Sequence, residues 1–205
     1  MLHIKRPGRA VADGVLRAMF AARKEVFVDL LKWDVPVLAG RYEVDQFDDE
    51  HAHYLVLATE GAGHLGSARL LPTVRPHILD SLYPELCEDA PPRSDTIYEI
   101  TRFCLDRGLD ARTRRTVRDT LVVALADHAI AHGLTAYTAI AEMGWLQQIL
   151  AFGWRCMPLG LPQTVGGKQV GALRIEITPE TPALLARAGI AAFPPLSGGT
   201  TRAAA

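Results

Sequence analysis

Charged side chains that could take part in chemistry are concentrated in the first half of the chain. Asp45 and Asp48 lie three residues apart in a segment that Pro36 and Gly40 interrupt. Arg69 lies inside the apolar stretch GSARLLPT, which is typical of a strand. An arginine in a buried strand needs a carboxylate partner, because an unpaired charge is costly to bury. The sequence therefore predicts one polar network instead of scattered surface charge.

A second group of residues adds a possible base and aromatic faces. Glu99 and Arg102 lie three apart in IYEITRF, and in a regular strand such residues point to opposite faces. Carboxylates are among the side chains that act as general bases, and such a base typically contributes about 10²–10⁴-fold to a rate. Arg23 and Phe27 share one face of a predicted helix, and Trp33 follows it. Aromatic faces attract cations by about 0.5–2 kcal/mol.

Residue type alone leaves a structural interpretation open beside the functional one. Arg23 with Asp45, or Arg69 with Asp48, can be an ion pair that only stabilises the fold. Isolated aromatic residues are more often part of a core than a platform for a ligand.

Metal and covalent chemistry have little support. His51 and His53 flank Ala52 beside several acids, but two histidines with scattered aspartates are a weak metal signature, so we expect no metal. Neither serine nor cysteine stands in a recognisable nucleophile setting.

The elements that must position these residues follow from apolar spacing. Helical spacing predicts one or two helices over 9–31 and further helices over 77–86, 113–132, 142–152 and 179–188. Strands are predicted over 54–59, 64–71, 96–105, 134–140 and 169–177. This order predicts a three-layer α/β/α sandwich around a mixed, largely antiparallel sheet, similar to the N-acetyltransferase superfamily. We expect a single domain over 1–190 and a disordered tail over 191–205.

Composition excludes several classes of protein. The 22 basic and 23 acidic residues leave a net charge of −1, which disfavours a nucleic-acid or membrane-surface binder. Three cysteines without CxxC spacing suit a reducing compartment. We find no signal-peptide pattern, and polar residues interrupt the longest apolar stretch, 121–141, so the sequence predicts a cytoplasmic protein.

Four blocks in order resemble the acyl-homoserine-lactone synthases, the quorum-sensing autoinducer synthases, over residues 16–154. The blocks are RKEVFVDLLKW, YEVDQFD, GSARLLPT with ILDSLYPEL, and YEITRFCL. The resemblance places the family's charged and aromatic signature on Arg23, Phe27, Trp33, Asp45, Asp48, Arg69, Glu99, Arg102 and Phe103. Tyr83, Tyr98 and Thr101 are mild departures, since the family more often has Phe, Trp and Ser there.

The resemblance implies an acyltransferase that uses S-adenosylmethionine as a co-substrate and holds no bound cofactor. The methionine α-amine attacks an acyl thioester, and the methionine carboxylate then closes the lactone and expels methylthioadenosine. Glu99 would be the base, amid the catalytic charges Arg23, Asp45, Asp48, Arg69 and Arg102. The S-adenosylmethionine site would comprise Phe27, Trp33, Arg69 and Phe103. Whether Arg69 holds the substrate carboxylate or structures the site stays open, and another N-acyltransferase or a non-catalytic carrier- or ligand-binding relative are the alternatives.

The acyl group and its donor suggest two further sets of residues. The stretch AYTAIAEMGWLQQIL could line an acyl tunnel through Thr138, Met143, Trp145, Leu146 and Leu150, although core packing is the alternative. Cations at a helix N-terminus oppose the helix dipole, so docking of an acidic acyl carrier protein would explain a basic run there, and a solvated loop is the equal alternative. That run contains Arg112, Arg114, Arg115 and Arg118.

Acyl-CoA is the other possible donor. Acetyl-CoA-dependent relatives hold a glycine-rich turn around the pyrophosphate at the start of this helix. RGLDARTRR has a single glycine, which argues against a standard pyrophosphate site without excluding CoA donors.

Overall fold

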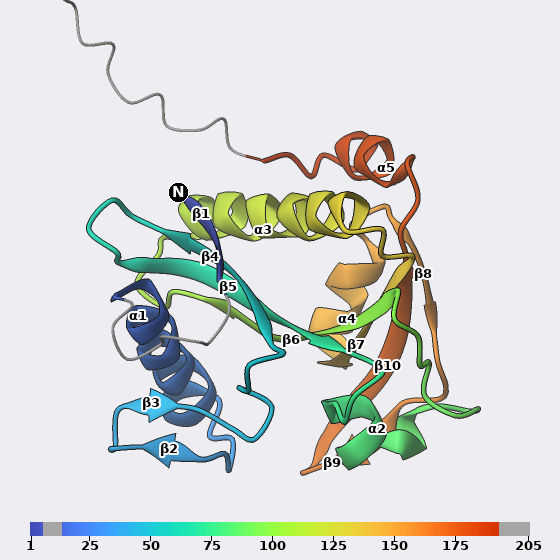
Figure 1. The fold of residues 1–205 in the computed structure, drawn as a ribbon, viewed down its shortest axis with the longest axis horizontal. Helices are drawn as coiled ribbons and strands as arrows, with labels where there is room; N and C mark the ends of the chain where they lie inside the picture. The colour runs from blue at the N-terminus through green and yellow to red at the C-terminus, as the bar shows by residue number, and fades with distance from the viewer. Residues whose placement is uncertain (6–13, 193–205) are drawn as a thin grey trace, which may run out of the picture.

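The computed structural model describes residues 1–5 and 14–192, and in it a mixed eight-stranded sheet forms the middle layer (Figure 1). The strand order is β1-β4-β5-β6-β7-β10-β8, with β9 paired to β10. The strands are β1 (Leu2–Lys5), β4 (His53–Ala58), β5 (His64–Pro72), β6 (Ile97–Leu105), β7 (Ala136–Glu142), β8 (Arg155–Pro158), β9 (Gln163–Val165) and β10 (Lys168–Glu176). A separate hairpin joins β2 (Val37–Leu38) to β3 (Tyr42–Glu43). Of the described pairings, β6 with β7 is parallel and the others are antiparallel.

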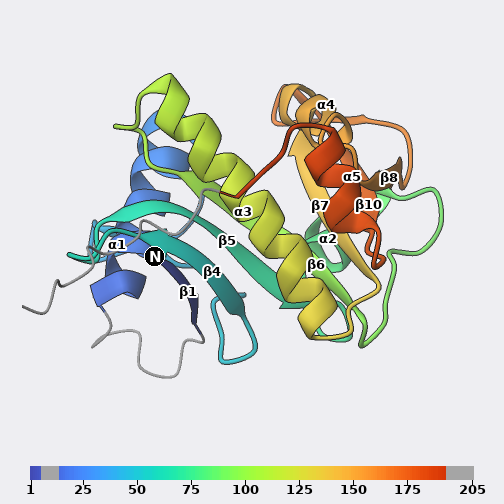
Figure 2. The ribbon, with the colours of Figure 1, turned by 90° about the horizontal axis from the view of Figure 1, so that it is seen from above.

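Helices cover both faces of this sheet. One face carries α3 (Ala111–Ala131), α4 (Met143–Leu150) and α5 (Thr181–Arg187), and Figure 2 shows α3 lying across it. The other face carries α1 (Gly14–Arg23), the π-helix η2 (Lys24–Leu30), α2 (Ile78–Leu82) and the 3-10 helix η3 (Pro84–Leu86). We call these the α3 face and the α1 face. The predicted three-layer sandwich is confirmed.

Alternation along the strands explains the two layers of core. Leu55 and Leu70 pack under α3, whereas Tyr54, Val56 and Leu71 pack under α1. The strands β4 and β5 are buried on both sides, so they read as nearly continuous apolar runs. The polar residues on the α1 face therefore have to find partners within the protein.

Several local predictions need correction. The segment that Pro36 and Gly40 interrupt contains the β2–β3 hairpin, which the sequence pattern does not predict. The strands β1, β8 and β9 are also not predicted, because they carry too few residues for a clear pattern. The helix predicted from residue 113 begins at Ala111, because Asp110 caps it. The first predicted helix begins partly outside the described residues and continues as a π-helix, and of the predicted tail only Ala191 and Ala192 are described.

A bulge in β6 decides where its charged side chains point. Ser67 pairs with Cys104 and Arg69 pairs with Thr101, so β6 has one more residue than β5 between these two pairs. Within this interval, Arg102 has a φ of +50°. Such a bulge shifts the alternation of side chains by one residue. Arg102 thus lies on the α1 face together with Glu99 and Arg69. The prediction of opposite faces for Glu99 and Arg102 is wrong because the strand is irregular at this point.

The parallel strands separate toward their carboxyl ends. The β6–β7 ladder runs from Ile97 with Ala136 to Ile100 with Ala139. Beyond these pairs, β6 remains paired with β5 and β7 remains paired with β10, but no further pairs join β6 to β7 among the described residues. In open α/β sheets, ligands bind at the carboxyl ends of parallel strands. The separation therefore marks the part of the sheet where a substrate could enter.

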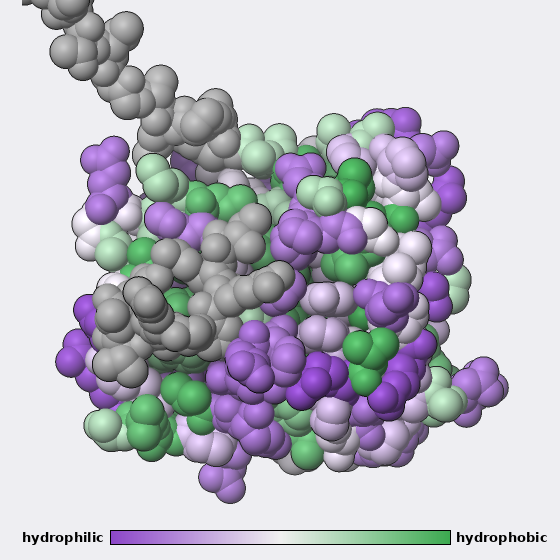
Figure 3. Space-filling view, in the orientation of Figure 1, coloured by the Kyte–Doolittle hydropathy of each residue, from purple (hydrophilic) through white to green (hydrophobic). Residues whose placement is uncertain are grey.

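The outer surface is mostly polar, with hydrophobic patches. Figure 3 shows hydrophobic residues over the β2–β3 hairpin, where Leu38 is 62% exposed. Within the described residues, the longest helices are too polar or too short to cross a membrane.

Candidate active site

Buried charges form a closed ring on the α1 face. Three arginines alternate with three carboxylates, and their side chains are at most 9% exposed. The formal charges of the ring cancel, which offsets the cost of removing each charge from water. Around the ring the order is Arg23, Asp48, Arg69, Asp45, Arg102 and Glu43.

Arg23 and Asp48 form the side of the ring under α1. The guanidinium Nη1 and Nη2 donate to the two Asp48 oxygens at 2.8 Å each, and Nε donates to Glu43. Burial disfavours the charge of Arg23, yet Asp48 and Glu43 hold its pKa above the ordinary value. Burial likewise opposes the Asp48 charge, but Arg23 and Arg69 hold the pKa of Asp48 well below its usual range. Arg23 and Asp48 are therefore both charged at neutral pH.

Arg69 uses all of its nitrogens inside the protein. Nη1 and Nη2 contact Asp45 at 2.6 and 3.0 Å, Nη1 lies 2.8 Å from Asp48, and Nε donates to the Thr101 hydroxyl at 2.9 Å. Arg69 is 1% exposed. These contacts occupy four of the five N–H donors of the Arg69 guanidinium.

Arg102 closes the ring because of the bulge in β6. Its Nη2 lies 2.7 Å from Asp45 and 3.0 Å from Glu43. A non-glycine residue at positive φ costs about 1–3 kcal/mol, so surrounding contacts must hold it there. The two carboxylates supply such contacts.

The structure brings together five ring residues that the sequence predicts, but with different pairing. The alternative pair of Arg69 with Asp48 is present. The pair of Arg23 with Asp45 is wrong, because Asp45 lies between Arg69 and Arg102. The bulge sends Arg102 toward Asp45, which spacing along the chain does not reveal.

Sequence reasoning missed two members of this network. Glu43 lies two residues before Asp45, so alternation in the short strand YEVD was an available signal. Tyr54 donates to Asp48 at 2.8 Å from within an apolar strand that reads as core. Burial and the neighbouring Asp48 raise the pKa of Tyr54, so its hydroxyl keeps its proton.

Glu99 lies on the same face, between the ring and α2. It is fully buried, and its carboxylate accepts hydrogen bonds from the Ile78 and Leu79 N–H groups at 2.8 and 3.1 Å. Burial raises the pKa of Glu99 to about 8, while these hydrogen bonds and Arg69 act in the opposite direction. A carboxylate has about four lone-pair sites, so about two remain beyond these hydrogen bonds. Glu99 can therefore exchange a proton near neutral pH.

Aromatic residues adjoin the ring at Arg102. Phe27, on the π-helix, stacks on Trp33 with ring centroids 4.7 Å apart and an angle of 21°. The Arg102 guanidinium lies 5.6 and 5.7 Å from the two ring centroids. π-Helical turns are frequent at functional sites, and here one carries Phe27 to this stack. Phe103 lies on the α3 face, 5.2 Å from Trp145 on α4.

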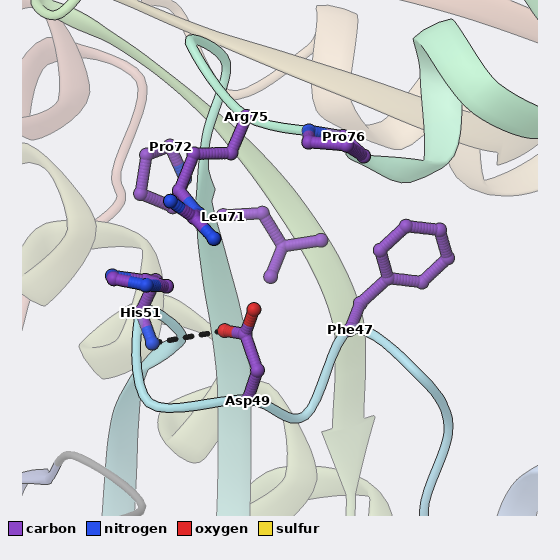
Figure 4. A pocket seen from close by; sticks show the side chains of 7 residues that line it. All are labelled: Phe47, Asp49, His51, Leu71, Pro72, Arg75 and Pro76. Atoms are coloured by element: carbon purple, nitrogen blue, oxygen red, sulfur yellow. Dashed lines mark hydrogen bonds between the residues drawn. The ribbon is translucent and has the colours of Figure 1, made fainter.

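A small pocket lies on the α1 face beside the ring (Figure 4). Phe47 lines it and also lies under the Arg69 guanidinium, 6.0 Å away. Leu71 lines it from β5 and is the register partner of Glu99. The other lining residues are Asp49, His51, Pro72, Arg75 and Pro76. His51 contributes here to a pocket wall, and the described residues contain no cluster of three or more potential metal ligands.

Comparison with known proteins identifies the family. A family model described as autoinducer synthase matches residues 10–183. This chain belongs to the autoinducer synthase family. An acyl-homoserine-lactone synthase of Ralstonia solanacearum is 32% identical over 195 residues, covering 91% of this chain and 94% of that protein. The family is therefore one of acyltransferase enzymes.

Solved structures agree with this assignment. The CoA-dependent acyl-homoserine lactone synthase BjaI, solved with SAM and isopentyl-CoA, is 29% identical with a TM-score of 0.81, over 93% of this chain and 90% of BjaI. An acyl-CoA N-acyltransferase from Pseudomonas aeruginosa is 17% identical with a TM-score of 0.60, over 85% of this chain and 97% of that one. The latter shares the fold alone.

The predicted acyl-tunnel residues of this autoinducer synthase do not share one face. Thr138 is the register partner of Glu99 on the α1 face, is fully buried, and its hydroxyl has no hydrogen-bond partner among the described residues. Leu146 packs in the α3-face core, with Met143 and Trp145 half-buried against it. Leu150 is 40% exposed, on the outer side of α4. Strand alternation separates Thr138 from the helix that follows.

The predicted docking arginines also divide into two groups. Arg114 donates to the Asp106 carbonyl at 3.0 Å, and Arg118 pairs with Asp119 at 2.7 Å while lying over Phe152. Arg112 is exposed, and the Arg115 side chain is 72% exposed. Arg112 and Arg115 are thus the two of the four that extend into solvent.

Proposed function

We propose that this autoinducer synthase transfers an acyl group from a thioester to the α-amine of S-adenosylmethionine and then closes the lactone. The assignment of Glu99 as the base is supported by its burial and by its pKa of about 8. An unperturbed α-amine has a pKa of about 7.7–8.0. Proton transfer between groups of matched pKa is close to thermoneutral, which suits general base catalysis.

In the first step, Glu99 takes a proton from the substrate ammonium group, directly or through a water. The free amine attacks the thioester carbonyl, the C–N bond forms, and the C–S bond breaks. The departing thiolate then takes up a proton. Thr138 supports a substrate position beside Glu99, because it lies next to Glu99 on the neighbouring strand and its hydroxyl has no hydrogen-bond partner among the described residues.

In the second step, the methionine carboxylate attacks its own γ-carbon. The C–O bond forms as the C–S bond to the sulfonium breaks, and methylthioadenosine leaves as a neutral thioether. Because the carboxylate and sulfonium charges cancel, no acid is needed. A dry site that holds the substrate folded is sufficient.

The ring and the aromatic residues shape the S-adenosylmethionine site. A ring of zero net charge does not repel the sulfonium, and its cross-links hold α1, the 43–48 segment, β5 and β6 together. Phe27 and Trp33 offer aromatic faces for the adenine or the sulfonium. We leave Phe103 outside this site, because it lies on the α3 face beside Trp145. We assign Arg69 as a positioning residue, since four of its five N–H donors already bind Asp45, Asp48 and Thr101.

The acyl chain enters where β6 and β7 separate. Thr138 borders this region on the α1 face, and Met143, Trp145 and Leu146 border it on the α3 face. We leave Leu150 outside this tunnel because of its exposure. An acyl thioester is the donor, and it can be carried by CoA, as in BjaI, or by acyl carrier protein.

A direct assay tests the proposed function. Purified protein with S-adenosylmethionine and thioesters of several acyl groups, each on CoA and on acyl carrier protein, should release methylthioadenosine. Mass spectrometry should find the matching acyl-homoserine lactone. Acyl amide without methylthioadenosine would indicate another N-acyltransferase, and binding of S-adenosylmethionine without any product would indicate a non-catalytic relative.

Charge reversal at the exposed arginines tests carrier docking. Arg112→Glu with Arg115→Glu should raise KM for acyl carrier protein about tenfold, since rim charges govern association and its salt dependence. Steady-state kinetics at two salt concentrations measures the effect. Arg187→Glu on α5, also exposed, is the matched control and should leave KM unchanged. An unchanged KM in the double variant would remove this surface from docking.

A further inference from the structure

His77 is a buried histidine that takes no part in the steps proposed above. It lies in the connection from β5 to α2, directly after Pro76, and is fully buried. Its Nδ1 lies 2.9 Å from the Arg75 carbonyl oxygen. Because a carbonyl oxygen only accepts, Nδ1 is the donor in this contact. The other ring nitrogen, Nε2, is buried and has no hydrogen-bond partner among the described residues.

The imidazole stands where a smaller residue would start the helix at least as well. His77 is the N-cap residue of α2, a position that asparagine, aspartate and serine usually occupy. A buried polar atom without a partner also destabilises the folded state. A buried polar group of this kind needs an explanation, and a contribution to a functional site is a common one. The contacts of the neighbouring backbone show which site His77 could serve.

The backbone that follows His77 holds the proposed base. The N–H groups of Ile78 and Leu79 donate to the two oxygens of Glu99 at 2.8 and 3.1 Å. The N–H of His77 itself donates to Asp80 at 2.8 Å. Three consecutive N–H groups thus bind two carboxylates. Because α2 has only five residues, it is too short to be stable alone, and its first turn depends on contacts such as these.

Both ends of the connection from β5 to α2 are attached to the protein. At its start, Thr73 is fully buried, and its hydroxyl lies 2.8 and 2.9 Å from the carbonyl oxygens of Ile97 and Ser94. At its end, the imidazole of His77 ties the chain back to Arg75. Figure 4 shows the chain between these points, which lines the small pocket beside the ring. The contact with Arg75 therefore fixes the turn immediately before the N–H groups that face the base.

We propose that His77 is a positioning residue whose imidazole fixes the turn that directs two backbone N–H groups at Glu99. The inference rests on the proposed function, because Glu99 is the base of that reaction. Hydrogen bonds from N–H groups favour the ionised carboxylate. Burial raises the pKa of Glu99, and these hydrogen bonds act against it. Without the imidazole, the hydrogen bonds would loosen and Glu99 would be protonated over more of the neutral range.

Other groups that face Glu99 set the background for this effect. Arg69, on β5, lowers the pKa of Glu99, and Asp80, on α2, raises it. Cys87, directly after η3, also faces Glu99, and burial together with that charge raises the pKa of the Cys87 thiol. Substitution of His77 removes none of these groups, and Asp80 keeps its hydrogen bond to the backbone N–H of residue 77. A change in the pKa of Glu99 would therefore report the geometry of the turn.

Three substitutions at His77 test the proposal. Alanine lacks a donor, and serine caps a helix but is too short to replace the contact with the Arg75 carbonyl. In His77→Ala and His77→Ser, the pKa of Glu99 should rise by about one unit, so the ionised fraction of the base at pH 7 should fall about tenfold. We expect kcat/KM at that pH to fall by the same factor. Asparagine places an N–H donor near the position of Nδ1, so His77→Asn should restore both values.

The pKa of Glu99 can be measured without turnover. Carbon-13 NMR of protein labelled at its glutamate carboxyl groups follows the titration, and Glu99→Gln assigns the signal. Asp110→Ala, at the N-cap of α3, is the matched control, because it removes the hydrogen bonds to the N–H groups of Arg112 and Thr113. It should lower Tm, as loss of a cap does, without moving the pKa of Glu99. Thermal melting of each variant confirms folding.

Two results would overturn the inference: an unchanged pKa of Glu99 in both His77→Ala and His77→Ser, or a loss of activity in these variants that is the same at every pH. Failure of the wild-type protein to release methylthioadenosine would instead refute the proposed function, and the NMR titration would still decide whether His77 positions the groups around Glu99.

Discussion

Replacement of Glu99 by glutamine should lower kcat for methylthioadenosine release by about 10²–10⁴-fold. Glutamine keeps the size of the side chain but cannot accept a proton from the substrate amine. The dissociation constant for S-adenosylmethionine, measured by calorimetry, should change far less. Equal losses in turnover and in binding would contradict the assignment of Glu99 as the base.

The pH dependence sharpens this test. Glu99 must be ionised to act as a base, so kcat/KM of the wild-type protein should rise with pH through about 8. The substrate amine titrates in the same range. The ratio of wild-type to Glu99→Gln activity removes that contribution, and it should increase with pH and then level off. A ratio that does not change with pH would contradict the proposal.

Stability provides a control on the environment of Glu99. Its pKa in the folded protein is about 8, above the ordinary 4.5, so the folded state binds this proton more tightly than the unfolded state. The stabilising contribution is complete below 4.5 and is lost as pH rises through about 8. In urea unfolding, the stability advantage of wild type over Glu99→Gln should therefore shrink with rising pH. The exposed Glu85→Gln variant should show no such trend.

Removal of one arginine from the ring should strongly destabilise the fold. Arg23→Ala leaves Glu43 and Asp48 buried without a main partner, and breaking a buried ion pair costs about 3–5 kcal/mol. For a chain of this size, Tm should fall by about 10 °C. Urea unfolding and calorimetry measure the loss, and activity should fall as well.

Matched variants distinguish the contribution of the ring to stability from that of the helix that carries Arg23. Glu25→Ala, at an exposed position of the π-helix that continues α1, should change stability by no more than about 0.5 kcal/mol. Arg23→Lys keeps the charge without the two-pronged contact and should lie between the two. Arg23→Met combined with Asp48→Asn should cost less than the sum of its single changes. Near-wild-type stability of Arg23→Ala would show that the ring does not hold this layer together.

The sequence by itself determined the layers, most of the elements and much of the site. Apolar spacing of 3.6 and 2 residues marks helices and strands because it reflects which side of a short segment is buried. Arg69 within the apolar stretch GSARLLPT and the paired aspartates were sufficient to predict a buried polar network. The resemblance to the family added Glu99 and the aromatic residues.

Tertiary structure alone decided how these residues connect. The bulge that turns Arg102 toward Asp45 depends on the register between β5 and β6, which no single segment encodes. Likewise, Thr138 and Leu146 are close in sequence yet lie on opposite faces of the sheet. Local spacing reports which residues are buried, whereas their partners depend on strands and helices that meet only in the folded chain.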